Sequence, residues 1–308
     1  MKIAVVLNPH ALGVKRNPGL AQRLRNTLGD AGEIVITHTP DQLAAAARRF
    51  ATDGVELVAA CGGDGTNLAT LTELVRAYGA QRLPTFAILR GGTVNTIARN
   101  LGLSGRPDRM LARLVAGARA GRLPTVGQDL LEVNGLYGFL FASLMGARFL
   151  EAYYQGSRPG VASAALLTAR TLASSLVQGR LARWLFAPVM VTLTVDGEAL
   201  PPTPYRLLVA SVVPDVGMGM RVTGRAGSEP RRFHLIASGL STTAMALQIH
   251  HVLRGRPLHG TPHLDRLAAR VHIRFAQPHS YTLDGDLFRA DTVEIVTGPH
   301  VRIARPDG

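Results

Sequence analysis

A run of three glycines around one aspartate, Cys61 to Thr66, constrains the fold of this chain more than any other feature. It follows the apolar segment 55–60 and precedes a helical pattern that starts near Asn67. An apolar run bounded by glycines is typical of a buried parallel strand. Glycines lack a Cβ, so their backbone N–H groups can approach a ligand closely, and the N-terminus of the next helix adds partial positive charge. The stretch therefore predicts a strand, a phosphate-binding loop and a helix, in which the carboxylate of Asp64 handles a proton or a metal ion.

The first 125 residues alternate between strand and helix patterns. Four strands are predicted, at 2–7, 33–37, 55–61 and 85–89. Five helices are predicted between and after them, at 18–28, 40–50, 67–78, 95–101 and 107–120. Strands separated by helices of this length are typical of βαβ units and a parallel sheet. We therefore expect an N-terminal α/β domain, residues 1–125, that binds a nucleotide and has a parallel sheet with helices on both faces.

The pattern changes after Pro124. Segments 128–133 and 137–143 flank Asn134-Gly135, a pair that favours the type I′ turn of a β-hairpin. Further strand patterns follow at 189–195, 205–213, 232–237, 271–275, 281–283 and 293–296. Two helical segments, 160–186 and 242–253, interrupt them. The second half, residues 126–308, is predicted to be an antiparallel, β-sandwich-like domain with inserted helices, and its last strand could return toward the first domain.

Composition narrows the class of protein. Of the 308 residues, 46% are hydrophobic and 18% are charged, which is ordinary for a globular protein and argues against disorder. The only cysteine, Cys61, excludes an internal disulfide framework and suits a reducing compartment. The apolar stretch 3–7 is too short for a signal peptide or a membrane span. We therefore expect a cytoplasmic protein.

The formal net charge is +13, and Lys2 and Lys15 are the only lysines, so arginine supplies nearly all of the positive charge. Nucleic acid, an anionic membrane surface and a phosphorylated substrate could each explain this charge, as could a solvated basic surface without a partner. Aromatic residues make up only 5% of the chain, so no nucleic-acid partner is expected. The basic segment 160–186 contains Trp184, the only tryptophan, and could lie on an anionic bilayer or simply cover the sandwich.

Two more polar loops follow predicted strands of the first half. Residues 90–95 contain Gly91-Gly92 and come directly after strand 85–89, and residues 8–13 come directly after strand 2–7. Ligands of parallel sheets bind at the carboxyl ends of the strands, so the three loops should converge on one nucleoside triphosphate site. None of them has the P-loop or Rossmann spacing, which shifts the neutralisation of phosphate charge to backbone amides and Mg²⁺.

In this order, the motifs 62–66, 92–95 and Asp284-Gly285-Asp286 resemble the diacylglycerol kinase catalytic-domain family. That family includes bacterial diacylglycerol kinases, sphingosine kinases and ceramide kinases. The resemblance covers almost the whole chain and implies ATP and Mg²⁺ as cofactors. The first motif alone is shared with NAD kinases.

Carried over by position, the resemblance implies a set of site residues. ATP contacts are implied for Asn8, Pro9, Gly13, Gly62, Gly63, Asp64, Gly65, Thr66, Asn67, Gly92, Thr93 and Asn95. Thr37 or Thr39 matches a threonine that contacts the nucleotide, with the register left open. Asp64 and Asp129 would belong to a carboxylate–water–Mg²⁺ network, and Asp286 would take the place of the general base.

The chain also departs from the family pattern. Asp286 replaces a glutamate and is one methylene shorter, which affects its reach to a substrate hydroxyl. Thr96 stands where many members have aspartate, and Ala69 stands where a glutamate often follows the glycine loop. A second Asp-Gly-Glu, residues 196–198, lies between strand patterns and is predicted to be a hairpin turn without a catalytic role.

The sequence therefore predicts an ATP-dependent lipid kinase that phosphorylates a hydroxyl of a diacylglycerol- or sphingolipid-like acceptor, such as ceramide or a sphingoid base. The acceptor would be met at an anionic membrane surface by a peripherally bound enzyme. One alternative, a non-catalytic nucleotide- or lipid-binding relative, is motivated by Thr96, Ala69 and Asp286. Another, NAD kinase, is disfavoured by the motif 92–95 and by the lack of an Asn-Glu pair after the glycine loop. The acceptor lipid and the oligomeric state cannot be predicted from the residues.

Overall fold

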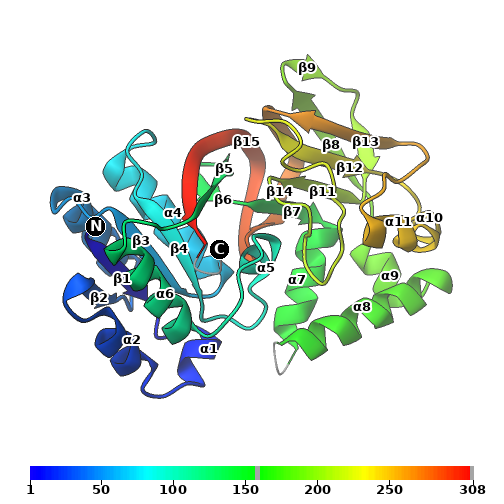
Figure 1. Ribbon diagram of the computed structural model, residues 1–308. Coiled ribbons are helices and arrows are strands. Elements are labelled where there is room, and N and C mark those ends of the chain that lie inside the picture. Colours follow the sequence, from blue (N-terminus) through cyan, green and yellow to red (C-terminus); the bar gives the residue numbers. More distant parts are fainter. Residues whose placement is uncertain (157–159, 306–308) are drawn as a thin grey trace. The chain divides into compact units, whose positions relative to one another are not determined.

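The computed structural model describes residues 1–156 and 160–305 (Figure 1). It divides into two compact units. Unit 1 comprises Met1–Leu130, Gly135–Gly138 and Gly298–Gly308, and unit 2 comprises Leu131–Asn134 and Phe139–Thr297.

Unit 1 is built on a parallel sheet whose strands lie in the order β4-β3-β1-β2. These strands are β1 (Ile3–Leu7), β2 (Gly32–Ile36), β3 (Leu57–Gly62) and β4 (Thr85–Arg90). Strands β1 and β3 are buried along their whole length, as expected for a sheet covered on both faces. The predicted N-terminal α/β fold with a parallel sheet is confirmed.

Helices cover both faces of this sheet. They are α1 (Leu12–Lys15), α2 (Leu20–Leu28), α3 (Pro40–Thr52), α4 (Asp64–Tyr78), α5 (Thr96–Asn100) and α6 (Pro107–Arg119), with a 3₁₀ turn η1 (Gly29–Ala31). Helix α3 packs with α4, and α2 packs with α6 (Figure 1). Helices α3 and α6 begin with proline at their first position, where the missing N–H costs nothing. Helix α3 buries Leu43, Ala46, Ala47 and Phe50, the spacing of a single apolar helix face.

Unit 2 is antiparallel. Its main strand order is β13-β12-β11-β7-β14. These strands are β7 (Leu140–Leu144), β11 (Leu207–Ser211), β12 (Phe233–Ser238), β13 (His263–Ala268) and β14 (Arg270–Leu283). A further group is formed by β8 (Val189–Val195), β9 (Glu198–Ala199) and β10 (Thr203–Tyr205). Strand β14 pairs with β8 before an irregularity between Arg274 and His279, and with β7 after it. A bulge of this kind bends a strand, which lets one strand serve both groups.

The last strand, β15 (Asp286–Ala304), is much longer than the predicted strand 293–296. Its first part pairs with β14, and Ile303 pairs in parallel with Phe86 of β4. Strand β15 also pairs with β5 (Thr125–Val133), which in turn pairs with β6 (Leu136–Gly138). Asn134 and Gly135 both have positive φ, 48° and 78°, so the predicted type I′ turn is confirmed.

The helices of unit 2 differ from the predicted ones. They are α7 (Met145–Gln155), α8 (Val161–Leu176), α9 (Arg180–Leu185), α10 (Thr242–Leu247) and α11 (Ile249–Arg254). The predicted segment 160–186 is two helices, because Gln178 adopts a left-handed φ of 50° between them. Helix α7 was not predicted; it follows β7 without a break, and no side chain caps its N-terminus. Among the described residues, no helix is both long enough and apolar enough to cross a membrane.

Candidate functional site

The first loop of unit 1 is fixed to the second by Asn8, which directly follows β1. The Asn8 backbone N–H donates to the carbonyl of Cys61 at 3.1 Å, and its side-chain amide donates to Oγ1 of Thr66 at 3.0 Å. Its side-chain oxygen accepts the N–H of His10 at 2.9 Å, which shapes the turn that contains Pro9. The loop after β1 therefore lies against the loop after β3.

The second and third loops approach so closely that side chains would not fit between them. The N–H of Gly91 donates to the carbonyl of Gly62 at 2.8 Å. A Cβ added to Gly92 would lie 2.6 Å from Cα of Gly63, and a Cβ on Gly13 would collide with the carbonyl of Gly91. All three loops thus meet at the carboxyl edge of the parallel sheet, and their predicted convergence is confirmed.

Asn95 shapes the third loop. It adopts a left-handed conformation with φ 51° and ψ 53°. Its side-chain oxygen accepts the N–H of Gly92 at 3.1 Å, and its amide donates to the carbonyl of Gly92 at 2.8 Å. The intervening Thr93 is half-buried.

Asp64 lies where helices α4 and α5 begin. It is the first residue of α4, and its carboxylate accepts the N–H of Thr96 at 2.8 Å and that of Ile97 at 3.2 Å. These are N–H groups of the first turn of α5, which lack partners inside that helix. Asp64 is half-buried and therefore holds the third loop against the second while its carboxylate stays at the edge of the site.

The first turn of α4 contains Gly65, Thr66 and Asn67. The first N–H groups of a helix have no partner within it and favour anions. Thr66 is buried, with its hydroxyl accepting from Asn8. Asn67 is only 1% exposed, and its side-chain oxygen has no hydrogen-bond partner among the described residues, so Asn67 lies inside the unit.

Arg90 was missed by the sequence reasoning. It is the last residue of β4, directly before Gly91. Its Nε is buried without a hydrogen-bond partner in the described part of the chain. A guanidinium at this edge of the sheet is a natural partner for phosphate. An arginine between an apolar strand and a glycine pair was the signal that could have identified it.

The two candidate threonines differ in position. The N–H of Thr37 donates to the carbonyl of Leu7 at 3.1 Å, which places this buried residue beside the start of the first loop. Thr39 is the N-cap of α3, and its hydroxyl accepts the N–H of Gln42 at 3.3 Å. The hydroxyl of Thr39 is therefore already used by the fold.

Asp129 lies on β5, and its Oδ1 is 2.8 Å from Nδ1 of His300 on β15. The described residues contain no group of three or more His, Cys, Asp or Glu side chains that could hold a metal ion. Asp64 and Asp129 therefore do not fit a metal site formed by the described residues alone. Mg²⁺ coordination by these two residues stays a prediction.

The motif Asp284-Gly285-Asp286 forms the turn between β14 and β15 in unit 2. Asp284 is only 4% exposed, and its carboxylate accepts the N–H groups of Phe139 and Leu140 at 3.0 and 2.9 Å. The hydroxyl of Tyr154 on α7 donates to the carbonyl of Gly285 at 3.0 Å. Asp284 is therefore a structural carboxylate.

Asp286 differs from Asp284 in that its side chain has no hydrogen bond or ion pair within the described chain. Its side chain reaches the surface, but burial by the surrounding protein raises the pKa of its carboxyl. An unpartnered carboxylate with a raised pKa is suited to accept a proton.

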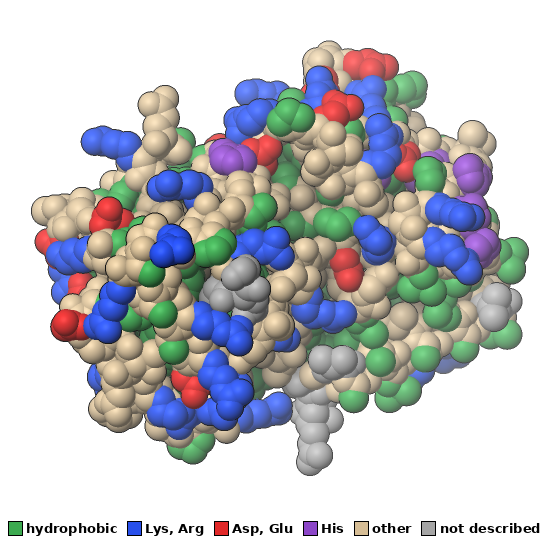
Figure 2. All heavy atoms as spheres, in the orientation of Figure 1, with side chains coloured by type: hydrophobic (Ala, Val, Ile, Leu, Met, Phe, Trp, Pro, Cys, Tyr) green, Lys and Arg blue, Asp and Glu red, His purple; other side chains and the backbone are tan. Residues whose placement is uncertain are grey.

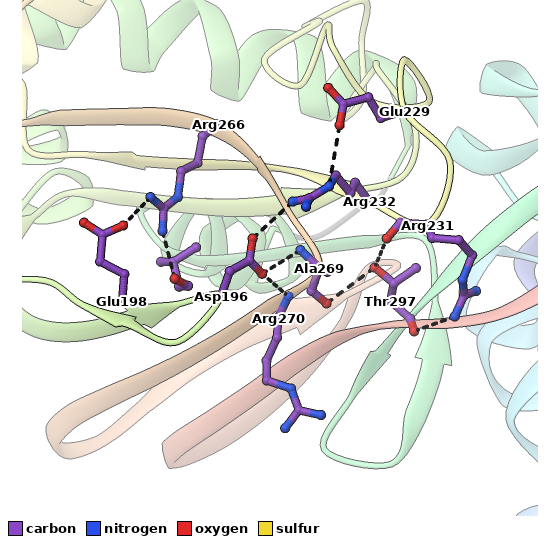
Figure 3. Close-up of polar contacts among 10 residues, drawn as sticks. Asp196, Glu198, Glu229, Arg231, Arg232, Arg266, Ala269, Arg270 and Thr297 are labelled. Carbon is purple, nitrogen blue, oxygen red and sulfur yellow. Dashed lines mark hydrogen bonds and ion pairs between the residues drawn. The ribbon is translucent and has the colours of Figure 1, made fainter.

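The other Asp-Gly-acid segment is part of a polar network (Figure 3). Burial opposes ionisation of Asp196, but the N–H groups of Arg270 and Ala269 and the guanidinium of Arg232 hold its pKa below the usual value. Glu198 pairs with Arg266 at 2.8 Å. Asp196 and Gly197 connect β8 to β9, so the predicted hairpin turn is confirmed.

The chain is similar to known proteins in its first part and in its fold. Residues 2–121 match the model of the diacylglycerol kinase catalytic domain. No curated protein matches the sequence. The crystal structure of a diacylglycerol kinase from Bacillus anthracis str. Sterne has a TM-score of 0.63 and 17% identity, covering 99% of this chain and 96% of that one.

Two other structures extend the comparison. A second structure from the same Bacillus anthracis strain has a TM-score of 0.71 and 16% identity, covering 99% of this chain and 97% of that one. Yeast NADH kinase complexed with NADH has a TM-score of 0.52 and 10% identity, covering 99% and 83%. At these identities the likeness shows the fold alone. Residues 2–121, less than half of the chain, are similar to the diacylglycerol kinase catalytic domain.

Proposed function

We propose that this protein is an ATP-dependent lipid kinase that transfers the γ-phosphate of ATP to a hydroxyl of a diacylglycerol- or sphingolipid-like acceptor. The observation that carries the proposal is the contact of three loops around Asp64 at the carboxyl edge of the parallel sheet. Phosphoryl transfer depends mainly on positioning the reactants and on neutralising phosphate charge. The loops at this edge of the sheet are held in fixed positions and carry N–H groups and a guanidinium that can neutralise this charge.

The triphosphate would be bound chiefly by backbone groups. The first N–H groups of α4 and the N–H groups of the glycine loops can donate to phosphate oxygens. Arg90, whose Nε has no partner among the described residues, adds a guanidinium at the same edge. The bond from Asn8 to Thr66 and those from Asp64 to α5 hold this frame rigid before ATP arrives.

The proton of the acceptor hydroxyl would be removed by Asp286. Its unpaired carboxyl has a raised pKa, which brings its proton affinity closer to that required of a general base. The neighbouring Asp284 is engaged with Phe139 and Leu140 and is not available for this role.

The decisive experiment supplies purified protein with γ-labelled ATP and a panel of acceptors: diacylglycerol, ceramide, a sphingoid base, phosphatidylglycerol and NAD. We expect labelled product with at least one lipid and none with NAD. Asp64→Asn should reduce the rate on the order of 100-fold or more, because an amide accepts the N–H groups of Thr96 and Ile97 less strongly than the carboxylate and leaves the third loop misplaced. The matched control is Asp41→Asn, which alters an exposed first-turn aspartate of α3.

Two outcomes would overturn the proposal. Phosphorylation of NAD alone would favour an NAD kinase, the class of one distant structural neighbour. ATP binding by calorimetry without ADP release for any acceptor would favour a non-catalytic relative. Asp64→Ala is the poorer test, because it leaves the N–H groups of Thr96 and Ile97 without their acceptor.

The proposal includes an anionic membrane surface as the place where the acceptor is met. Residues 160–188 and 239–262 contain five arginines and no aspartate or glutamate. These segments form α8 to α11, and α8 packs with both α9 and α10. Large apolar side chains are exposed on them: Leu166, Val177, Trp184, Leu247 and Leu253. Over α10 and α11, Figure 2 shows histidine and basic side chains beside hydrophobic ones. Apolar and basic groups on the same helices are typical of a surface that lies on anionic lipid.

Trp184 provides the test, since it is the only tryptophan and is exposed. Its fluorescence should shift to the blue with vesicles that contain phosphatidylglycerol, and less so at high salt or with neutral phosphatidylcholine. The double variant Arg180→Gln/Arg183→Gln should weaken co-sedimentation, whereas Arg48→Gln, on α3, should not. Equal binding to neutral and anionic vesicles would contradict this part of the proposal.

A further inference from the structure

Unit 2 contains a polar cavity that the proposed kinase reaction does not use. It has a volume of about 240 Å³ and lies between α7 and the β14–β15 hairpin. Its apolar lining consists of Leu144, Ala147 and Pro278, and its charged or titratable lining consists of Arg148, Glu151, His279 and Arg289. The cavity is partly open to solvent, since Pro278 and Arg289 of its lining are exposed.

The two arginines are held in place by carbonyls and keep other donors unused. Nη1 of Arg148 donates to the carbonyls of Leu185 and Ala187 at 3.1 and 2.7 Å. Nε of Arg289 donates to the carbonyl of Pro278 at 3.2 Å. The remaining guanidinium N–H groups of both have no hydrogen-bond partner among the described residues. Anchoring before binding lowers the entropy cost of ordering long side chains around a ligand.

His279 is fixed in a similar way. Its Nδ1 is 3.2 Å from the carbonyl of Gln277, and its ring stacks on Phe275 with centroids 5.2 Å apart. Nδ1 therefore carries a proton, and Nε2 is left to meet a ligand. His279 directly follows the irregular stretch of β14, and such a bulge turns side chains out of the regular alternation of the strand.

Glu151 is the one carboxylate of the cavity. Its negative charge favours the charged form of Arg148, whose pKa is nevertheless lowered by burial. With Glu151 opposing two guanidiniums, the lining retains an excess of positive charge. An anion would be stabilised by the arginines, and a hydroxyl on the same molecule could donate to Glu151.

We propose that this cavity binds a phosphate ester that also carries a free hydroxyl, either a soluble polyol phosphate or the headgroup of an acidic phospholipid. Arg148 and Arg289 bind the phosphate oxygens, His279 contacts the same anion, and Glu151 accepts a hydrogen bond from the hydroxyl.

This binding does not depend on kinase activity. If the lipid kinase assignment also holds, occupancy could be sensed at Asp286: Ser280 pairs with Arg289 and Leu283 with Asp286, about 10 Å along the same hairpin. Tyr154 also ties α7 to that turn.

Calorimetry of the full chain, without ATP, tests the proposal. The probes are glycerol 3-phosphate, ethyl phosphate and dihexanoyl phosphatidylglycerol below its micelle concentration. We expect saturable binding of at least one glycerol-bearing probe, weakened about tenfold or more by Arg289→Gln, since a charged hydrogen bond to phosphate is lost. The matched control is Arg274→Gln, an exposed arginine on β14 that does not line the cavity and should change affinity less than twofold.

The variant Glu151→Gln distinguishes the contribution of the ligand hydroxyl to binding from that of the phosphate. It should weaken the glycerol-bearing probes and leave ethyl phosphate unchanged or tighter. Binding of the soluble ester but not of the phospholipid identifies a metabolite site, and the reverse identifies a headgroup site. Absence of binding by the wild-type protein, or binding that Arg289→Gln leaves intact, would overturn the proposal. The second outcome would assign the anion to the glycine loops of unit 1.

Discussion

Unit 2 contains two Asp-Gly turns that have the same backbone conformation, but their acidic side chains have different surroundings. Asp196-Gly197 and Asp284-Gly285 each join two paired strands. Their φ angles are nearly identical, 51° and 88° in the first and 49° and 94° in the second. An acidic residue follows in both, Glu198 and Asp286. The sequence pattern therefore determines the backbone of the turn, and the backbone does not distinguish the two.

The two turns differ in the groups that contact their carboxylates. Glu198 is neutralised by Arg266, and Asp196 is held by Arg232 and two backbone N–H groups. Asp286 has no such partner among the described residues, and its pKa is raised. Ion pairs with arginines therefore give the acidic groups of the Asp196-Gly197 turn a structural role. Asp286 has no such pair among the described residues, so its carboxyl is able to exchange a proton.

The largest expected effect concerns the last residue of each turn. Asp286→Asn should lower kcat for lipid phosphorylation by about 10²- to 10⁴-fold, the usual contribution of a general base. Glu198→Gln should leave kcat unchanged, because that side chain only pairs with Arg266. Asp286→Glu should retain activity. Comparable kcat values for Asp286→Asn and the wild type would remove the functional difference between the two turns.

The first residue of each turn should differ in stability. Asp284→Ala leaves the buried N–H groups of Phe139 and Leu140 without an acceptor, which should cost about 3 kcal/mol. Asp196→Ala, at a partly exposed position, should cost only about 1 kcal/mol. Urea unfolding of both variants measures the difference. A larger loss of unfolding free energy for Asp196→Ala than for Asp284→Ala would mean that the Asp196-Gly197 turn contributes more to stability.

How much of this could be predicted depends on the distance over which the residues act. The glycine loops and the Asn134-Gly135 turn were predictable because their backbone conformations require particular residue types at those same positions. Helix α7 was not, since no cap marks its start and its last turn is held by a bond from Tyr154 to Gly285, 131 residues away. The pairing of Asp129 with His300 spans 171 residues and leaves no local signal. Arg90 had a local signal, but only the structure shows that its Nε is buried without a partner.

The raised pKa of Asp286 should also appear in the pH dependence of kcat. If this carboxyl must be ionised to accept a proton, kcat should fall on acidification below a midpoint that lies above the ordinary aspartate pKa of 3.8. The pH profile of kcat measures this limb. It should be lost in Asp286→Asn, whose residual rate loses its dependence on this group. It should be kept in Glu198→Gln. An identical acid limb in Asp286→Asn would assign the titration to another group.

The smallest effect is also the one that contrasts the turns most directly, because the two pKa shifts have opposite signs. The folded-state pKa of Asp196 is lowered, so this group contributes stability above its unfolded pKa of 3.8 and loses it as the pH falls through the lower folded value. The pKa of Asp286 is raised, so its contribution is most favourable at low pH and declines as the pH rises from 3.8 through the folded value. Urea unfolding between pH 3 and 7 should therefore show Asp196→Asn losing stability relative to wild type as the pH rises, and Asp286→Asn gaining it. Equal pH slopes for the two variants would mean that the surrounding arginines do not separate the two turns.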